Sequence, residues 1–96
     1  MKQKLYLINM IKEKITLLDK IGFHARTASL FAKKASSFNA EVSVEFMGKK
    51  VNGKSTLSLM TLGVKTQNDI FVIASGVDEV AALKSLIELI KSNFND

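Results

Sequence analysis

The sequence predicts one domain of the α+β class, an open-faced β-sandwich in which three helices cover one face of a four-stranded, mostly antiparallel sheet. The chain has 96 residues, a length that suits a single domain with one core. Segments that alternate apolar and polar residues are interleaved with segments of helical periodicity, in the order β-α-β-β-α-β-α. A single sheet of such strands needs helices over its apolar side, which leaves the other face to solvent.

The first half of the chain predicts a strand, a loop, a helix and a hairpin. Alternate apolar positions place one strand at residues 11–18, and a loop that contains glycine follows at 19–22. A helix with one buried face is expected over residues 25–37, because its apolar side chains recur at i, i+3, i+4 and i+7. Residues 42–46 alternate as a half-buried strand does, and a short turn leads into a partner strand at 50–52.

The second half predicts a short helix, a central strand and a longer helix. Ser55 is placed to cap a helix of about two turns, which Gly63 should end. Residues 69–75 are apolar on both sides, so this strand is expected at the centre of the sheet. Asp78 is expected as the N-cap of the last helix, which has a stripe of apolar residues at helical spacing.

Residues 1–10 are interpreted as an N-terminal extension outside the domain at 11–96. They precede the first strand that the sheet needs, and Met10 could itself serve as a start. The extension is expected either to lengthen that strand or to be a disordered tail.

Composition argues against several kinds of site. The chain has no cysteine, so it has neither disulfides nor thiolate metal sites, and a reducing cytoplasm is the expected location. One histidine leaves too few ligands for zinc, and no metal or cofactor is expected. No apolar run approaches the 18 or so residues of a membrane span, and residues 5–11 are too short and interrupted for a signal peptide.

The charge pattern gives little support for nucleic-acid binding. The formal net charge is +5, but the lysines are scattered and are interpreted mostly as solvation of the surface. The chain has one tyrosine, no tryptophan and no recognisable RNA-binding motif. A basic RNA-binding α/β domain remains an alternative, and strong, salt-dependent affinity for RNA would identify it.

The residues around His24 suit phosphate chemistry. The imidazole is expected at the start of a helix, where unpaired backbone N–H groups and a partial positive charge bind anions. Arg26 adds a fork of donors for phosphate oxygens, and a neutral imidazole has a nucleophilic ring nitrogen. The alternative is that His24 is only a polar cap. No second histidine, cysteine or carboxylate pair competes as a reaction centre, which favours phosphate binding or transfer.

Two motifs resemble the HPr family, the histidine-containing phosphocarrier proteins of the phosphoenolpyruvate-dependent sugar phosphotransferase system. The first is Gly22-Phe23-His24-Ala25-Arg26, and the second, Asn52-Gly53-Lys54-Ser55, leads into residues 57–63. The resemblance runs from about Lys12 to the last helix. It implies that His24 accepts a phosphoryl group on Nδ1 from phospho-enzyme I and passes it to enzyme IIA components, with Arg26 stabilising the transferred group. It also implies a monomeric carrier and not an enzyme with its own turnover.

The resemblance has one departure inside the first motif, because the family usually has proline where this chain has Thr27. Proline fixes φ and lacks an N–H that would otherwise need a partner. The loop is therefore expected to lose stiffness, and a Thr27→Pro change is expected to cost little stability or to raise it.

The resemblance also implies regulation at Ser55, through phosphorylation by an ATP-dependent HPr kinase/phosphorylase, and a catabolite-control regulator as a further partner. A helix start tolerates the added negative charge. The alternative is an ordinary capping serine, because Asn52-Gly53 stands where the family more usually has Asn-Leu.

The resemblance further implies an apolar docking surface for enzyme I and enzyme IIA, formed by Phe23, Thr27, Leu57 and Met60. Apolar residues at helical spacing are more often part of the core, but a two-turn helix cannot bury every face. The rival function is a regulatory HPr-like binding module without phosphotransfer. The regulatory variants of the family lack the histidine, so His24 and Arg26 favour the carrier.

Overall fold

The computed structural model describes residues 10–95, and these form the expected order of elements. The strands are β1 (Ile11–Thr16), β2 (Glu41–Phe46), β3 (Lys49–Asn52) and β4 (Asp69–Ser75). The helices are α1 (Ala25–Ser36), α2 (Thr56–Met60) and α3 (Glu79–Lys91). The expectation for the N-terminal extension concerns residues 1–9, which lie outside the described residues.

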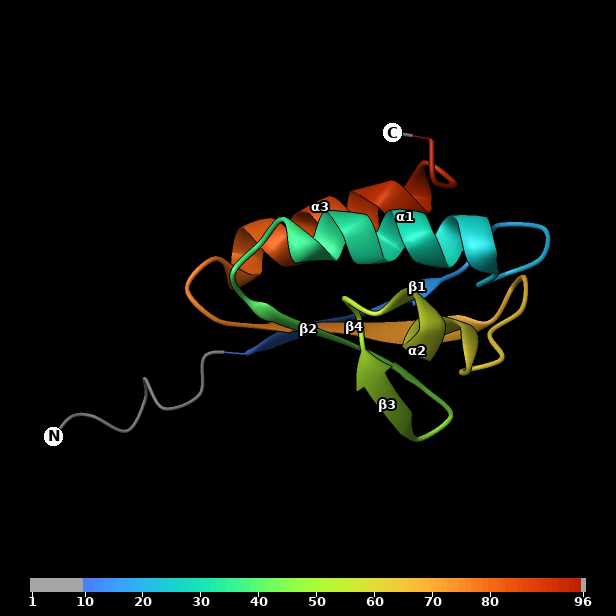
Figure 1. The fold of residues 1–96 in the computed structure, drawn as a ribbon, viewed down its shortest axis with the longest axis horizontal. Helices are drawn as coiled ribbons and strands as arrows, with labels where there is room; N and C mark the ends of the chain where they lie inside the picture. The colour runs from blue at the N-terminus through green and yellow to red at the C-terminus, as the bar shows by residue number, and fades with distance from the viewer. Residues whose placement is uncertain (1–9, 96) are drawn as a thin grey trace, which may run out of the picture.

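The four strands form one antiparallel sheet in the order β1-β4-β2-β3. β4 pairs with β1 on one side and with β2 on the other, so the central position predicted for it is confirmed. Its apolar residues Ile70, Val72 and Ala74 are almost fully buried. Figure 1 shows α1 and α3 side by side over one face of this sheet, as the fold class requires.

The core lies between this face of the sheet and the helices. α1 contributes Phe31 together with three small side chains, those of Ala28, Ala32 and Ala35. Small residues on a helix let its backbone approach the sheet closely, so Phe31 can fill the space between the layers. α2 adds Leu59, which has no exposed surface. α2 packs against α1.

Two elements are shorter than the sequence pattern predicts. β1 ends at Thr16, and just beyond it the N–H of Leu17 donates to the carbonyl of Asn68 in the loop before β4. α2 ends at Met60, where the Thr61 N–H closes the last turn, and the buried Leu62 follows with its N–H bonded to the carbonyl of Leu59. Gly63 follows with a φ of 73°, so it does end this region, as expected.

Asp78 does not use its side chain as the N-cap of α3, which corrects the sequence-based expectation. It occupies the capping position without a side-chain capping bond. Its carboxylate instead accepts hydrogen bonds from the N–H groups of Asn39 and Ala40, at 2.8 and 2.7 Å. The start of α3 is therefore tied to the connection between α1 and β2.

Candidate functional site

The loop between β1 and α1 is fixed by the segment that follows α2. The N–H of Phe23 donates to the carbonyl of Val64 at 3.1 Å. Gly22 has a φ of 101°, and a Cβ at this position would lie 2.2 Å from the same carbonyl oxygen. Only glycine fits such a conformation and such a close approach. The loop therefore delivers the next residues to a defined place.

His24 lies directly before the first turn of α1, as predicted. Its backbone is extended, with φ −133° and ψ −172°, and its carbonyl accepts the first helical hydrogen bond from Ala28 at 2.9 Å. Its side chain is 30% exposed, so it is held in place and still reachable from solvent. A helix start of this kind attracts negative charge.

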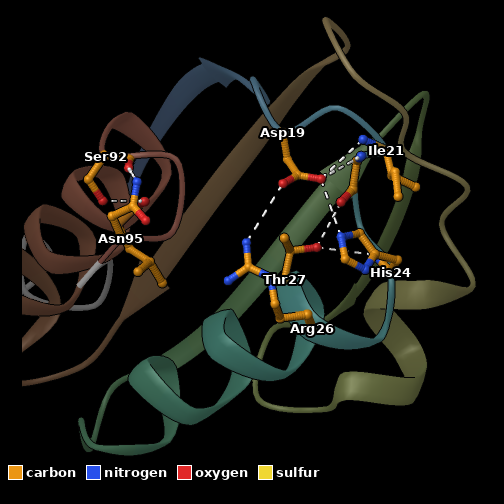
Figure 2. A network of polar contacts seen from close by, with 9 residues as sticks. Asp19, Ile21, His24, Arg26, Thr27, Ser92 and Asn95 are labelled. Carbon is orange, nitrogen blue, oxygen red and sulfur yellow. Dashed lines mark hydrogen bonds and ion pairs between the residues drawn. The ribbon is translucent and has the colours of Figure 1, made fainter.

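A buried carboxylate, that of Asp19, lies against the histidine ring (Figure 2). One oxygen, Oδ2, lies 3.3 Å from Nε2 of His24 and accepts from the backbone N–H groups of Ile21 and Gly22. The other oxygen, Oδ1, lies 3.9 Å from Nη2 of Arg26. One carboxylate thus contacts both side chains that the sequence assigned to phosphate chemistry.

Asp19 is ionised over the ordinary range of pH. Burial alone would raise its pKa, but the hydrogen bonds from Ile21 and Gly22, with the nearby ring of His24, hold the pKa below its usual value of 3.8. The carboxylate therefore acts as an acceptor toward the His24 ring.

Arg26 is more exposed than either of its neighbours. Its side chain is 56% exposed, and a contact of 3.9 Å to Asp19 is a loose ion pair. A long side chain held this weakly can turn its donors to an incoming anion.

Thr27 is fully buried, so the expectation that it contacts partner proteins is wrong. Its hydroxyl donates to the carbonyl of Gly22 at 2.7 Å and accepts from the N–H of His24 at 3.1 Å. The threonine closes the loop on itself through these two bonds. The loop thus gains two hydrogen bonds that a proline side chain could not supply, and the loss of stiffness expected from Thr27 stays a prediction.

Phe23 is also a core residue and not a docking residue. Its side chain is 7% exposed, and its ring packs edge-on against Phe31 and Phe94, with centroids 5.6 and 6.4 Å apart. It anchors the loop to α1 and to the C-terminal segment. The exposed apolar side chain in this loop is that of Ile21, at 64%.

Ser55 and the two apolar residues of α2 lie where the sequence predicted them. The Ser55 hydroxyl accepts from the N–H of Ser58 at 3.2 Å, which confirms it as a helix cap. Leu57 is 74% exposed and Met60 is 40% exposed, whereas Leu59 is buried. α2 therefore presents two apolar side chains to solvent.

Sequence reasoning missed Asp19 and the hydroxyl of Thr27 as parts of the site. It treated Asp19 only as a residue that breaks the first strand. The available signal was an aspartate shortly before the histidine in a loop with glycine, since carboxylates often orient a histidine ring.

No helix within residues 10–95 is both long and apolar enough to cross a membrane. In the same part of the chain, no group of three or more histidine, aspartate or glutamate side chains could hold a metal ion.

Comparison with known proteins places the chain among phosphocarriers. The family model described as the PTS HPr component phosphorylation site matches residues 11–92. The HPr-like protein Crh of Bacillus subtilis is 43% identical over 77 residues, which cover 80% of this chain and 91% of Crh. The phosphocarrier protein HPr of Neisseria meningitidis serogroup A is 37% identical over 87 residues, covering 91% of this chain and 98% of that protein.

Solved structures agree with the fold. The crystal structure of HPr-C-His from Thermoanaerobacter tengcongensis has a TM-score of 0.86 and 42% identity, and the match covers 90% of this chain and 97% of that one. A second structure from the same organism is titled as an HPr dimer, with a TM-score of 0.72, 44% identity, and coverage of 85% and 94%.

Proposed function

Because this chain belongs to the HPr family, the phosphocarrier proteins of the sugar phosphotransferase system, we propose that His24 carries the phosphoryl group. The proposed donor is phospho-enzyme I and the proposed acceptors are enzyme IIA components, in the cytoplasm. The observation that carries the proposal is the position of His24, half-buried at the start of α1 with Arg26 beside it. The protein is thus proposed as a covalent relay and not as an enzyme with its own turnover.

The geometry supports transfer through Nδ1. Nε2 faces the carboxylate of Asp19, so Nδ1 is the ring nitrogen on the side of the first turn of α1, where a capping box pairs the His24 side chain with the Thr27 N–H. A phosphoryl group on this nitrogen would lie close to the first turn of α1, whose N–H groups favour negative charge. Arg26 can supply further donors to the phosphoryl oxygens.

The test is transfer of label from phosphoenolpyruvate in the presence of enzyme I. We expect one acid-labile, base-stable phosphohistidine on the wild-type protein and none on His24→Ala. Undiminished labelling of His24→Ala would end this proposal. Transfer of the label onward to a purified enzyme IIA tests the second half of the relay.

We propose Ile21, Leu57 and Met60 as the docking surface for these partners. All three are exposed and apolar, and Figure 2 shows Ile21 beside His24. The flexible side chain of methionine suits a surface that meets more than one partner. Leu57→Ser should raise the KM for phosphorylation by enzyme I, whereas a change at Val77, which is even more exposed and precedes α3, should leave it unaltered.

Ser55 is proposed as a regulatory phosphorylation site for an ATP-dependent HPr kinase/phosphorylase. Its place at the start of α2, beside the exposed Leu57, means that a phosphate there would add charge at the docking surface. A catabolite-control regulator is the proposed reader of that mark.

One observation favours a second candidate, a regulatory HPr-like module that docks partners without carrying flux. The relative at 43% identity is an HPr-like protein, Crh. His24 and Arg26 argue for the carrier, because a binding module has no need of either. Partner binding that persists in His24→Ala, together with a wild-type protein that takes no label, would favour the module.

A further inference from the structure

Asp19 makes more contacts than are needed to hold the loop before α1 in place. Its Oδ2 accepts from two backbone N–H groups, which is sufficient to hold a tight turn. Yet the same oxygen also reaches Nε2 of His24 at 3.3 Å, and the second oxygen faces Arg26. The side chain is only 12% exposed, so water does not compete strongly for these contacts.

We propose that Asp19 is a positioning residue for phosphoryl transfer, whose carboxylate keeps the proton of the neutral His24 ring on Nε2 and so presents the Nδ1 lone pair to the donor. The inference rests on the proposed function of His24. A carboxylate can only accept a hydrogen bond, so the nitrogen that faces it must carry the hydrogen. The other nitrogen of a neutral ring is then the nucleophile.

The carboxylate also balances the charge that the reaction creates. The Nδ1 lone pair forms the new N–P bond while the bond from phosphorus to the donor breaks, and its electron pair leaves with the donor. The Nε2 proton stays on the ring, which becomes a cation. Asp19 lies against that proton, as the buried aspartate of a serine protease triad lies against its histidine. In onward transfer the N–P bond breaks, its electron pair returns to Nδ1, and the ring is neutral again.

Asp19→Asn is the informative variant. An amide has nearly the same shape, and its oxygen can still accept from Ile21 and Gly22. That same oxygen faces Nε2, so it remains an acceptor but loses its charge, while the NH₂ takes the place of Oδ1 toward Arg26. The hold on the Nε2 hydrogen and on the ring cation formed by phosphorylation should therefore weaken. Asp78→Asn is the matched control, because Asp78 is also an aspartate that accepts from two backbone N–H groups, at the opposite end of α1 from His24.

Two measurements test the proposal. Long-range ¹H–¹⁵N spectra of histidine-labelled protein report which ring nitrogen carries hydrogen when the ring is neutral. Rapid-quench phosphorylation by enzyme I reports the rate. We expect the Nε2–H form in the wild type and in Asp78→Asn. In Asp19→Asn we expect a larger share of the Nδ1–H form and a rate reduced about tenfold or more, as loss of one charge-assisted hydrogen bond implies.

A ring hydrogen on Nδ1 in the wild-type protein would overturn the proposal without any variant. A folded Asp19→Asn protein with an unchanged tautomer and rate would overturn it as well, and the two aspartates would then both be simple fasteners. Failure of the wild type to accept phosphate would refute the proposed function instead, because the tautomer is measured without phosphotransfer.

Discussion

Thr27 is the residue whose buried hydroxyl closes the loop before α1. Thr27→Val keeps the shape of the side chain but leaves the Gly22 carbonyl and the His24 N–H without their partner. Unsatisfied buried groups cost about 1–3 kcal/mol, so the free energy of unfolding should fall by about that amount. Urea denaturation measures it.

Thr27→Ser is the control, because it keeps the hydroxyl and loses one methyl group, and its cost should be smaller than that of valine. Thr27→Pro should behave like valine, since proline has no hydroxyl. This reverses the sequence-based expectation that proline would be neutral or stabilising. Equal stability of the valine variant and the wild type would show that the two bonds contribute nothing net.

Arg26 should matter for transfer and little for stability. Its side chain is 56% exposed and its contact with Asp19 is long, and such pairs contribute about 0–1 kcal/mol. Arg26→Ala should therefore slow phosphorylation of His24 and leave the melting temperature nearly unchanged. Arg26→Lys keeps the charge without the planar fork, and its rate of phosphorylation should lie between those of the wild type and Arg26→Ala. A large fall in melting temperature would instead make Arg26 a structural residue.

Periodicity located His24 and Arg26 but could not reveal the contacts of Asp19 and Thr27. Both contacts arise where a non-periodic loop folds back on itself, held by the Val64 carbonyl and by the left-handed backbone of Gly22. Local patterns describe regular segments, and they carry no information about which side chain a loop turns inward. The surface position expected for Thr27 came from the family resemblance, which implied a docking role for it, and not from periodicity.

Among the elements, α2 links a modification to a surface. A phosphate on Ser55 adds about −1.5 to −2 charges at the start of this helix, where the backbone N–H groups tolerate it. The fold should persist, and phosphorylation of His24 by enzyme I should slow, because a dianion beside Leu57 opposes close apolar contact.

The measurement is treatment with the ATP-dependent HPr kinase, location of the phosphate by mass spectrometry, and timing of transfer from enzyme I. Ser55→Ala is the control that removes both modification and cap. Ser55→Asp should show a smaller effect than the phosphate, since it carries one charge in a different geometry. No modification, or an unchanged rate after it, would leave Ser55 as a cap alone.

Asp78 connects α3 to the segment before β2, and this connection should depend on pH. The pKa of Asp78 is lowered chiefly by the hydrogen bond from the Asn39 N–H, opposed by desolvation and aided by Ala40. A lowered folded-state pKa means that the unfolded chain binds the proton first as pH falls. The stabilisation is therefore complete above the ordinary value of 3.8 and is lost below it, as pH falls through the folded-state pKa.

Urea unfolding of the wild type and of Asp78→Asn over a series of pH values checks this. The difference between the two unfolding free energies should be constant near neutral pH and should shrink at strongly acid pH. Comparing the two proteins removes the contribution of Asp19, whose pKa is lowered in the same direction. A difference that stays constant at every pH would show that Asp78 is not the titrating group.

The helices and strands were largely predictable because each has one apolar face of regular period. The residues at which these elements end were less predictable. α2 stops after five residues, at a Thr61 cap, and the buried Leu62 lies beyond it, although the sequence pattern continues to Leu62. Asp78 was correctly placed at the start of α3, but its side chain bonds to residues far away in the sequence, which capping patterns do not reveal.

On the scale of the whole molecule, we expect a monomer in solution. Every helix contributes to one core, and apart from the proposed docking surface the exposed apolar side chains of the described residues are dispersed over loops and the start of α3. A formal net charge of +5 also opposes self-association. Light scattering after gel filtration should give a mass near 10.6 kDa. Twice that mass, at concentrations that span the physiological range, would indicate a dimer like the one titled for the Thermoanaerobacter tengcongensis protein.

The strand order has a consequence for biosynthesis. β4 occupies the centre of the sheet, yet it is the last strand to leave the ribosome, and its partner residues in β1 lie far back in the chain, as Ile11 does from Ala74. Until Asp69–Ser75 emerge, the nascent β1 and β2 have no common neighbour, and Leu17 has no Asn68 carbonyl to bond. Pairings this distant in sequence form slowly. A translation product that stops before β4 would therefore contain His24 and Arg26 without the scaffold that orients them, so the histidine becomes competent only after β4 has been made.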